Sequence, residues 1–301
     1  MKWPRPPQYT AYERVAMRLL FAAVLLFVIP PRLRYTTVPV PNGLARIADL
    51  GFLLDPSVFA ICRYVFWALI FLYVLRIALV AVLPCLTLFV IAVGSLNNSQ
   101  GAIGHTRQIV ALVLLAQTAA HVYTCLRRVR DQESNGNENS ENRMVYWSQQ
   151  AIAATYLTSA LTKLLHTSGK WFLQSPLVAL QIVKTTDQNY YNTLEPNRYG
   201  AGVAIAEWIV QHPLLVAIIM GAGLLLELTA PLMLRGRGLA LLYGIALLTF
   251  HETVGRVMKL NFPFNEYLLW IYVVNVPYWA VHGWLWMKRV IQRRSSPALD
   301  R

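Results

Sequence analysis

The sequence predicts an all-α protein that crosses a membrane as a polytopic bundle of about eight helical spans. Hydrophobic residues make up 56% of the 301 residues and charged residues only 14%, whereas about 25% of a soluble domain is charged. Several apolar runs are long enough to cross a bilayer as helices. The basic residues gather at the ends of these runs. The net charge of +13 therefore indicates membrane topology rather than nucleic-acid binding.

Each expected span is an apolar run bounded by proline, basic or polar residues. Pro30 and Pro31 end the first run, and Arg76 separates the second from the third. Pro84 predicts a kink in the third. The polar segment 127–147 predicts a flexible, solvent-exposed loop. We expect one integral membrane domain over residues 1–301, without a large extramembrane domain, with spans at 15–29, 58–74, 77–93, 107–125, 148–166, 214–234, 239–251 and 267–286.

Groups of basic residues predict the orientation. An eight-span topology places four such groups on one side, and the positive-inside rule makes that side cytoplasmic. We therefore expect an integral protein of the plasma (inner) membrane with both termini in the cytoplasm. The groups are Lys2, Arg5, Arg14 and Arg18; Arg127, Arg128 and Arg130; Arg235 and Arg237; and Lys288, Arg289, Arg293 and Arg294.

Lys163 lies within the apolar fifth span, where a lysine costs roughly 2.5–3.5 kcal/mol at mid-bilayer on insertion scales. Thr155, Ser159, Lys163 and His166 share one helical stripe, which predicts a polar face lining an internal cavity. Lys163 could act there as a base, because an apolar setting favours the neutral amine. Alternatively, it extends to the outer interface or pairs with a carboxylate such as Glu207.

Other ionisable residues fall near Lys163 in the expected topology. Lys163, His251 and His105 all lie at similar depth on the outer side. His251 could hydrogen-bond to a ligand or pair with neighbouring Glu252, and His105 alone would suit a solvated loop. Glu227 lies within the sixth span, where we expect Arg76, Arg235 or a backbone donor to pair with it. The histidines lack a common ligand spacing, so we expect no metal site.

Three segments carry a resemblance to a known family. The first is Ser159-Ala-Leu-Thr-Lys163-Leu, preceded by Tyr156 and followed by Lys170-Trp171. The second is Gly221 to Pro231, with Glu227 among leucines, and the third is Phe250-His251 followed by Asn261-Phe-Pro-Phe. These segments resemble the membrane part of the vitamin K-dependent gamma-glutamyl carboxylases and the wider horizontally transferred transmembrane domain family.

The resemblance implies roles for individual residues. Lys163 matches the base that deprotonates vitamin K hydroquinone, and His251 matches a histidine near the quinone. His105 matches a further family histidine. We expect Tyr156, Ser159, His166 and Trp171 to line the same outer-side cavity for vitamin K hydroquinone or another quinone. Two departures stand out: Thr162 replaces a second lysine, and the chain has no counterpart of the large propeptide-binding domain.

Two classes of function follow, and whether the protein is an enzyme stays open. The first is a carboxylase-like membrane protein that binds a quinone or a similar lipid-soluble molecule. The second is a non-catalytic membrane protein, such as a lipid-binding scaffold, a peptide-maturation factor or a complex subunit. A small-solute transporter is disfavoured by the lack of internal repeats. The expected partners are the bilayer, a lipid-soluble small molecule and a separate soluble or secreted protein, but no nucleic acid.

Overall fold

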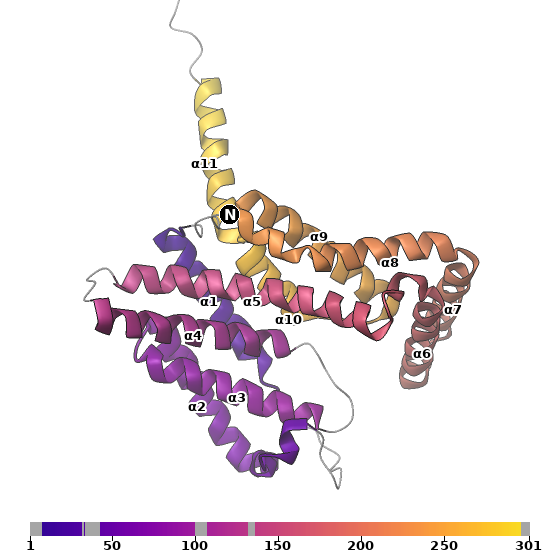
Figure 1. The fold of residues 1–301 in the computed structure, drawn as a ribbon, viewed down its shortest axis with the longest axis horizontal. Coiled ribbons are helices and arrows are strands. Elements are labelled where there is room, and N and C mark those ends of the chain that lie inside the picture. Colours follow the sequence, from indigo (N-terminus) through magenta and orange to yellow (C-terminus); the bar gives the residue numbers. More distant parts are fainter. Residues whose placement is uncertain (1–7, 32, 34–42, 100–106, 132–135, 296–301) are drawn as a thin grey trace, which may run out of the picture.

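A computed structural model describes residues 8–31, 33, 43–99, 107–131 and 136–295, which form helices and no strand (Figure 1). The α-helices are α1 (Ala11–Val28), α2 (Pro56–Leu75), α3 (Leu79–Asn98), α4 (Gln108–Asp131), α5 (Gly136–His166), α6 (Ser175–Thr193), α7 (Pro196–Gln211), α8 (Pro213–Leu228), α9 (Arg237–Met258), α10 (Pro263–Leu268) and α11 (Val276–Ser295). Short helical turns are η1 (Gly43–Arg46), η2 (Gly51–Leu54), η3 (Trp171–Leu173), η4 (Ala230–Arg235) and the π-helical η5 (Leu269–Val274).

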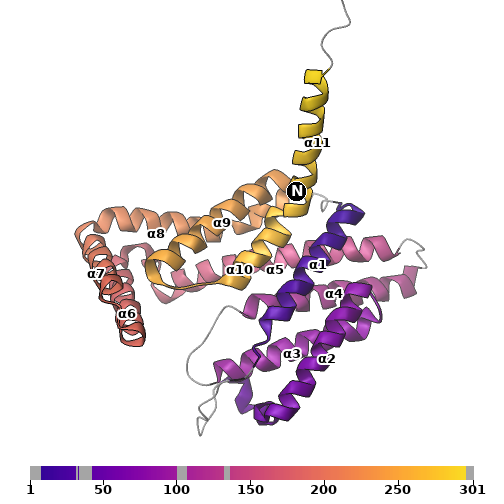
Figure 2. The same cartoon turned by 180° about the vertical axis from the view of Figure 1, so that it is seen from behind.

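The long helix α5 runs through the middle of the molecule (Figures 1 and 2). α4 packs along one side of it, with α3 and α2 beyond, while α8, α9 and η4 lie on its other side. The α6–α7 hairpin lies beyond the carboxyl end of α5, and α11 extends away from the bundle. The helix α5 therefore joins the two halves of the fold and can present residues to both.

Four of the described helices are long and apolar enough to cross a membrane: Pro56–Leu75, Leu79–Asn98, Gln108–Arg127 and Arg237–Met258. A fifth span results if α7 and α8, which are bent by 96° at their junction, count as one broken span. This supports an integral membrane protein, but with fewer clear spans than eight. The runs expected at 15–29 and 148–166 are helical in α1 and α5, and both helices also include polar turns before the predicted run.

The expectation of a flexible loop over 127–147 is wrong in the described part of that segment. The helix α4 continues to Asp131, and α5 already begins at Gly136. Two polar side chains near the end of this segment have partners in the protein. Asn142 accepts a hydrogen bond from the backbone of Tyr9, and Arg143 donates one to Thr124 and lies 4.8 Å from the ring of Tyr123.

The expected eighth span, 267–286, is not one continuous helix. It begins as α10 and η5, breaks at Asn275 in the left-handed conformation (φ 58°), and resumes as α11. Pro277 follows the break, and proline disfavours helical geometry in the residue before it and removes a backbone donor. Two other boundaries also differ, because α8 ends at Leu228 before the short η4, and α9 continues to Met258.

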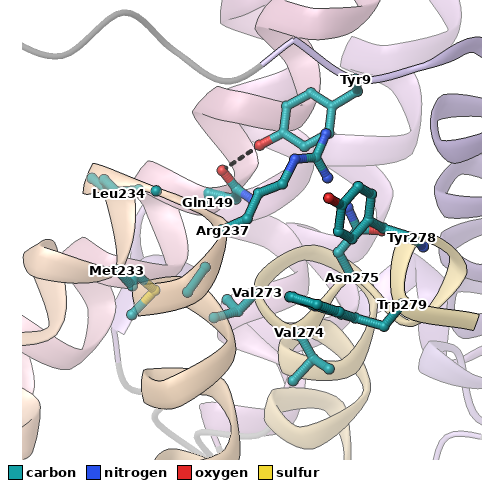
Figure 3. A pocket seen from close by; sticks show the side chains of 12 residues that line it. Tyr9, Gln149, Met233, Leu234, Arg237, Val273, Val274, Asn275, Tyr278 and Trp279 are labelled. Atoms are coloured by element: carbon teal, nitrogen blue, oxygen red, sulfur yellow. Dashed lines mark hydrogen bonds between the residues drawn. The ribbon is translucent and has the colours of Figure 1, made fainter. Parts of the chain in front are cut away.

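A polar junction holds the start of α1, the start of α9 and the break at Asn275 together. The guanidinium of Arg237 lies 5.2 Å from the ring of Tyr9 and 4.0 Å from that of Tyr278 (Figure 3). It also forms an ion pair of 2.5 Å with Glu13, which is fully buried. Asn275 donates a second hydrogen bond to the same carboxylate, at 2.8 Å. This junction fixes the direction in which α11 leaves the bundle.

A small residue allows α9 to approach η5 closely. A Cβ atom placed on Gly244 would lie 2.6 Å from a methyl group of Val274 and 3.3 Å from its backbone nitrogen. We therefore expect Gly244→Ala to destabilise the protein by about 1–3 kcal/mol through overpacking. Gly238→Ala, in the same helix but with nothing within 4 Å, is the control and should be neutral or stabilising. Thermal unfolding in detergent tests the pair, and equal melting temperatures would contradict the prediction.

Candidate functional site

One face of α5 carries the polar residues that the sequence singled out. Tyr156, Ser159 and Lys163 are three and four residues apart, so they lie on the same side of the helix. That side faces α8 and α9, which supply the partners described next. Of the predicted stripe, Ser159 and Lys163 lie on this face, which is covered by helices rather than facing an open channel, whereas the Thr155 hydroxyl donates to the Ala151 carbonyl of its own helix.

Lys163 pairs with Glu227 of α8. Its Nζ lies 2.5 Å from Oε2 of Glu227, and the two side chains are 25% and 5% exposed. The Ser159 hydroxyl lies near the same carboxylate, and the ammonium also lies 5.7 Å from the Trp171 ring centre. The partner of Glu227 is therefore Lys163 rather than Arg76 or Arg235, and the carboxylate that pairs with Lys163 is not Glu207.

Tyr156 and His251 form a second pair deeper in the same site. The Tyr156 hydroxyl lies 2.7 Å from Nε2 of His251, and the Asn265 side chain lies near the same hydroxyl. His251 is 6% exposed, with its ring between those of Phe250 and Phe262. The histidine therefore sits in an aromatic setting with one nitrogen held by tyrosine.

Two polar atoms around this inner pair of Tyr156 and His251 have no hydrogen-bond partner among the described residues. They are Nδ1 of His251 and Oδ1 of Asn265, and both are buried. When the tyrosine hydroxyl donates to Nε2, the ring proton of a neutral histidine is on Nδ1. The site then offers one unused donor and one unused acceptor. Buried polar atoms without partners are rare and costly, and they often mark a place where a ligand binds.

The two pairs belong to one site, which we call the Lys163 cluster: Tyr156, Ser159, Lys163, Glu227, His251 and Asn265. The charge of Lys163 is near enough to His251 to act on it electrostatically. His251 of α9 thus meets, through its contact with Tyr156, the face of α5 that also carries Lys163. His251 is not at the end of its helix, however, because α9 extends seven residues beyond it.

Two residues expected in the site are not brought into the cluster. His166 is exposed at the last position of α5, three residues after Lys163, and no hydrogen bond joins it to the cluster. His105 lies outside the described residues. The two hollows that the structure shows have other linings, one around Arg237 and one around Glu141. The expected cavity around Lys163 and His251 is neither of these.

Sequence reasoning missed Asn265 and left the partner of Glu227 open, because several cations were candidates. Asn265 lies in α10 and follows directly after the Asn261-Phe-Pro-Phe segment, which was the available signal. No group of three or more potential metal ligands occurs in the part of the chain that the structure describes.

The Lys163 cluster lies near one end of α5. Glu141, near the other end, is 22 residues away, which is about 33 Å along a continuous helix at 1.5 Å per residue. The hydrocarbon core of a bilayer is about 30 Å thick. Two charged clusters on one helix at this separation suit the two surfaces of a membrane.

Comparisons of the chain with protein-family models, with curated proteins and with solved structures find no match. The chemistry of the Lys163 cluster is therefore derived from its own residues and geometry.

Proposed function

We propose that this integral membrane protein binds a quinone or hydroquinone, of the vitamin K type or similar, at the Lys163 cluster. The observation that carries the proposal is an unused donor on His251 and an unused acceptor on Asn265, two residues that both lie near the Tyr156 hydroxyl, in the cluster that also holds the lysine–carboxylate pair. A quinone oxygen can accept from Nδ1, and a hydroquinone hydroxyl can donate to Oδ1. The rings of Phe250 and Phe262 supply apolar surface beside these two atoms.

A bound hydroquinone would supply a weakly acidic phenolic hydroxyl and two reducing electrons. Lys163 is the base in this proposal, and it needs a neutral amine to accept a proton at Nζ. Glu227 makes that form accessible. When the ammonium proton moves to the carboxylate, both groups become neutral, which an apolar setting favours. After Nζ takes up the phenolic proton, Glu227 still holds the proton that it received from the amine, so the new ammonium is balanced by the deprotonated hydroquinone and stays within 2.5 Å of Glu227.

The partial exposure of the cluster fits a ligand that arrives from outside the bundle. Leu161 and Leu165 on α5, and Leu225 on α8, are 44%, 80% and 60% exposed on the faces of these helices that point away from the cluster. The Lys163 side chain is itself one quarter exposed, whereas Glu227 and His251 are almost fully covered. A ligand would therefore meet Lys163 and Trp171 first and reach His251 last.

The proposed topology places the Lys163 cluster at the outer surface of a plasma (inner) membrane and both chain termini in the cytoplasm. It is supported by Arg14, Arg18, Arg76 and Glu141, which meet near the opposite end of α5. Such a concentration of arginines is typical of the cytoplasmic side. A separate soluble or secreted protein would act as a partner in this scheme. Cysteine labelling at Ser168 from outside intact cells tests the orientation, and exclusive labelling from inside would overturn it.

Ligand binding should depend on the inner pair. We expect menadione, a short naphthoquinone, to raise the melting temperature of the purified wild type in detergent. His251→Phe keeps an aromatic ring between Phe250 and Phe262 but removes the Nδ1 donor, so affinity should fall at least about tenfold. His212→Phe, at an exposed histidine outside the cluster, is the matched control and should bind like the wild type.

Two results would contradict this proposal. The first is an equal menadione response of His251→Phe and wild type. The second is no response in the wild type across the soluble range of the quinone. A non-catalytic membrane role would then be the better-supported function, because Lys163 and Glu227 already neutralise each other without a ligand. In that case the pair would serve only to join α5 to α8.

A further inference from the structure

A second hollow lies beside Glu141, well away from the Lys163 cluster. It encloses about 400 Å³, including space open to its surroundings. Its walls come from α1, the turn between α2 and α3, α4, α5 and η5. We call it the arginine hollow; its charged lining consists of Arg14, Arg18, Arg76 and Glu141.

The arginine hollow carries more positive than negative charge. Glu141 pairs with Arg14 at 3.0 Å, with Arg18 at 2.5 Å and with Arg76 at 3.0 Å. Arg18 and Arg76 alone bring two positive charges to this one carboxylate, so the hollow carries an excess of positive charge without counting Arg14. Such an excess in a partly buried site favours binding of an anion.

One donor in the hollow also lacks a partner. Nε of Arg18 is buried, and no acceptor among the described residues lies within hydrogen-bond distance. The neutral polar side chains at the floor of the hollow, by contrast, hydrogen-bond to one another. Tyr73 donates to Gln117 at 3.0 Å, and Gln117 donates to Tyr272 at 2.8 Å. The binding capacity that remains is therefore on the guanidinium groups rather than on the neutral floor.

The hollow is at the depth of lipid headgroups. Arg76 forms the turn between α2 and α3, two candidate membrane spans of 20 residues each. Each is about 30 Å long, which matches the hydrocarbon core, so the turn between them lies at a membrane surface. Leu75, Ile77 and Val80 around this turn are 49%, 49% and 56% exposed. Acyl chains can cover these side chains while a headgroup reaches the arginines.

We infer that the arginine hollow binds the phosphate of an anionic membrane phospholipid. Guanidinium groups recognise phosphate through charge-assisted hydrogen bonds, and basic pockets between membrane helices bind anionic headgroups. Met17, Met144 and Val145 supply apolar wall for the glycerol and upper acyl region. The site is independent of quinone binding, since it lies near the opposite end of α5.

Binding of dioctanoyl phosphatidylglycerol to the purified full chain in neutral detergent tests the inference. Native mass spectrometry or thermophoresis should show specific binding of this lipid, whereas dioctanoyl phosphatidylcholine should bind at least about tenfold more weakly. Arg76→Gln should weaken phosphatidylglycerol binding by about tenfold, because it removes one charge at the rim. Arg76→Lys keeps the charge and should retain part of the affinity.

Arg256→Gln is the control, because Arg256 is 79% exposed in an ion pair with Glu252 on α9, and it should bind like the wild type. Arg18→Gln gives an independent check if Arg76→Gln proves unstable. Equal affinity for the two lipids, or unchanged affinity in both arginine variants, would overturn the inference. Inorganic phosphate is the third probe. If it binds as tightly as phosphatidylglycerol and displaces it, the lipid assignment is wrong and the hollow is a free-phosphate site.

Discussion

Replacing Lys163 by methionine should destabilise the folded protein as well as abolish quinone binding. The substitution leaves Glu227, which is 5% exposed, without its cation. Removing one partner of a buried ion pair costs about 3–5 kcal/mol, and the partial exposure of the lysine reduces the expected loss to about 2–3 kcal/mol. Thermal unfolding in detergent measures this loss. Lys170→Met, at an exposed lysine beyond α5, should change the melting temperature little.

A second substitution separates the structural role from the proposed chemistry. Lys163→Met/Glu227→Met removes both charges and should recover most of the lost stability, because well-packed apolar residues can replace a buried ion pair. The same double variant should still fail to bind menadiol or to deprotonate it. A double variant that is both stable and fully able to bind the hydroquinone would reject Lys163 as the base and leave the pair a packing device.

The helices that the sequence predicts best are those whose apolar run alone determines them. α2 and α3 agree with the runs 58–74 and 77–93 within a few residues, apart from the extension of α3 to Asn98. In these helices every backbone polar group is paired internally, so a continuous apolar run of membrane length leaves few alternatives. Pro84 lies inside α3 without ending it.

Polar segments were predicted less well, because composition does not show whether a polar side chain contacts water or another polar group of the protein. Glu141 is in a segment that resembles a solvated loop, yet it is the centre of three ion pairs. The break at Asn275 could have been predicted from the sequence. An asparagine two residues before Pro277 favours a turn, but the apolar residues on both sides made a single span the simpler interpretation.

The sequence analysis assigned the site to one face of α5 and to a depth in the membrane, but it did not say which side chains are in contact. Helical spacing puts Tyr156, Ser159 and Lys163 together, and the resemblance adds His251 from another helix. Periodicity cannot say which carboxylate meets a lysine, because that depends on how α5 and α8 rotate against each other. The pairing with Glu227 and the unused atoms of His251 and Asn265 therefore required coordinates.

Replacing Glu13 should have the largest effect on stability outside the Lys163 cluster. This carboxylate is fully buried and accepts hydrogen bonds from Arg237, from Asn275 and from the backbone and hydroxyl of Thr10. Glu13→Ala would leave the Arg237 cation without its counter-charge, at a cost of about 3–5 kcal/mol. Because the junction sets the break before α11, we also expect faster proteolysis within α11. Glu252→Gln, in an exposed pair on α9, should cost less than about 1 kcal/mol.

The same carboxylate predicts how stability depends on pH. Burial alone would raise the pKa of Glu13, but the hydrogen bonds from Arg237, Thr10 and Asn275 outweigh it and lower the pKa below the ordinary value of 4.5. A group whose folded pKa is depressed contributes stability above its unfolded pKa and loses it as the pH falls through the folded pKa. The melting temperature of the wild type should therefore drop as the pH falls below about 4.5, and Glu13→Gln should show a smaller drop. Parallel pH profiles of the two proteins would show that Glu13 is not the group responsible.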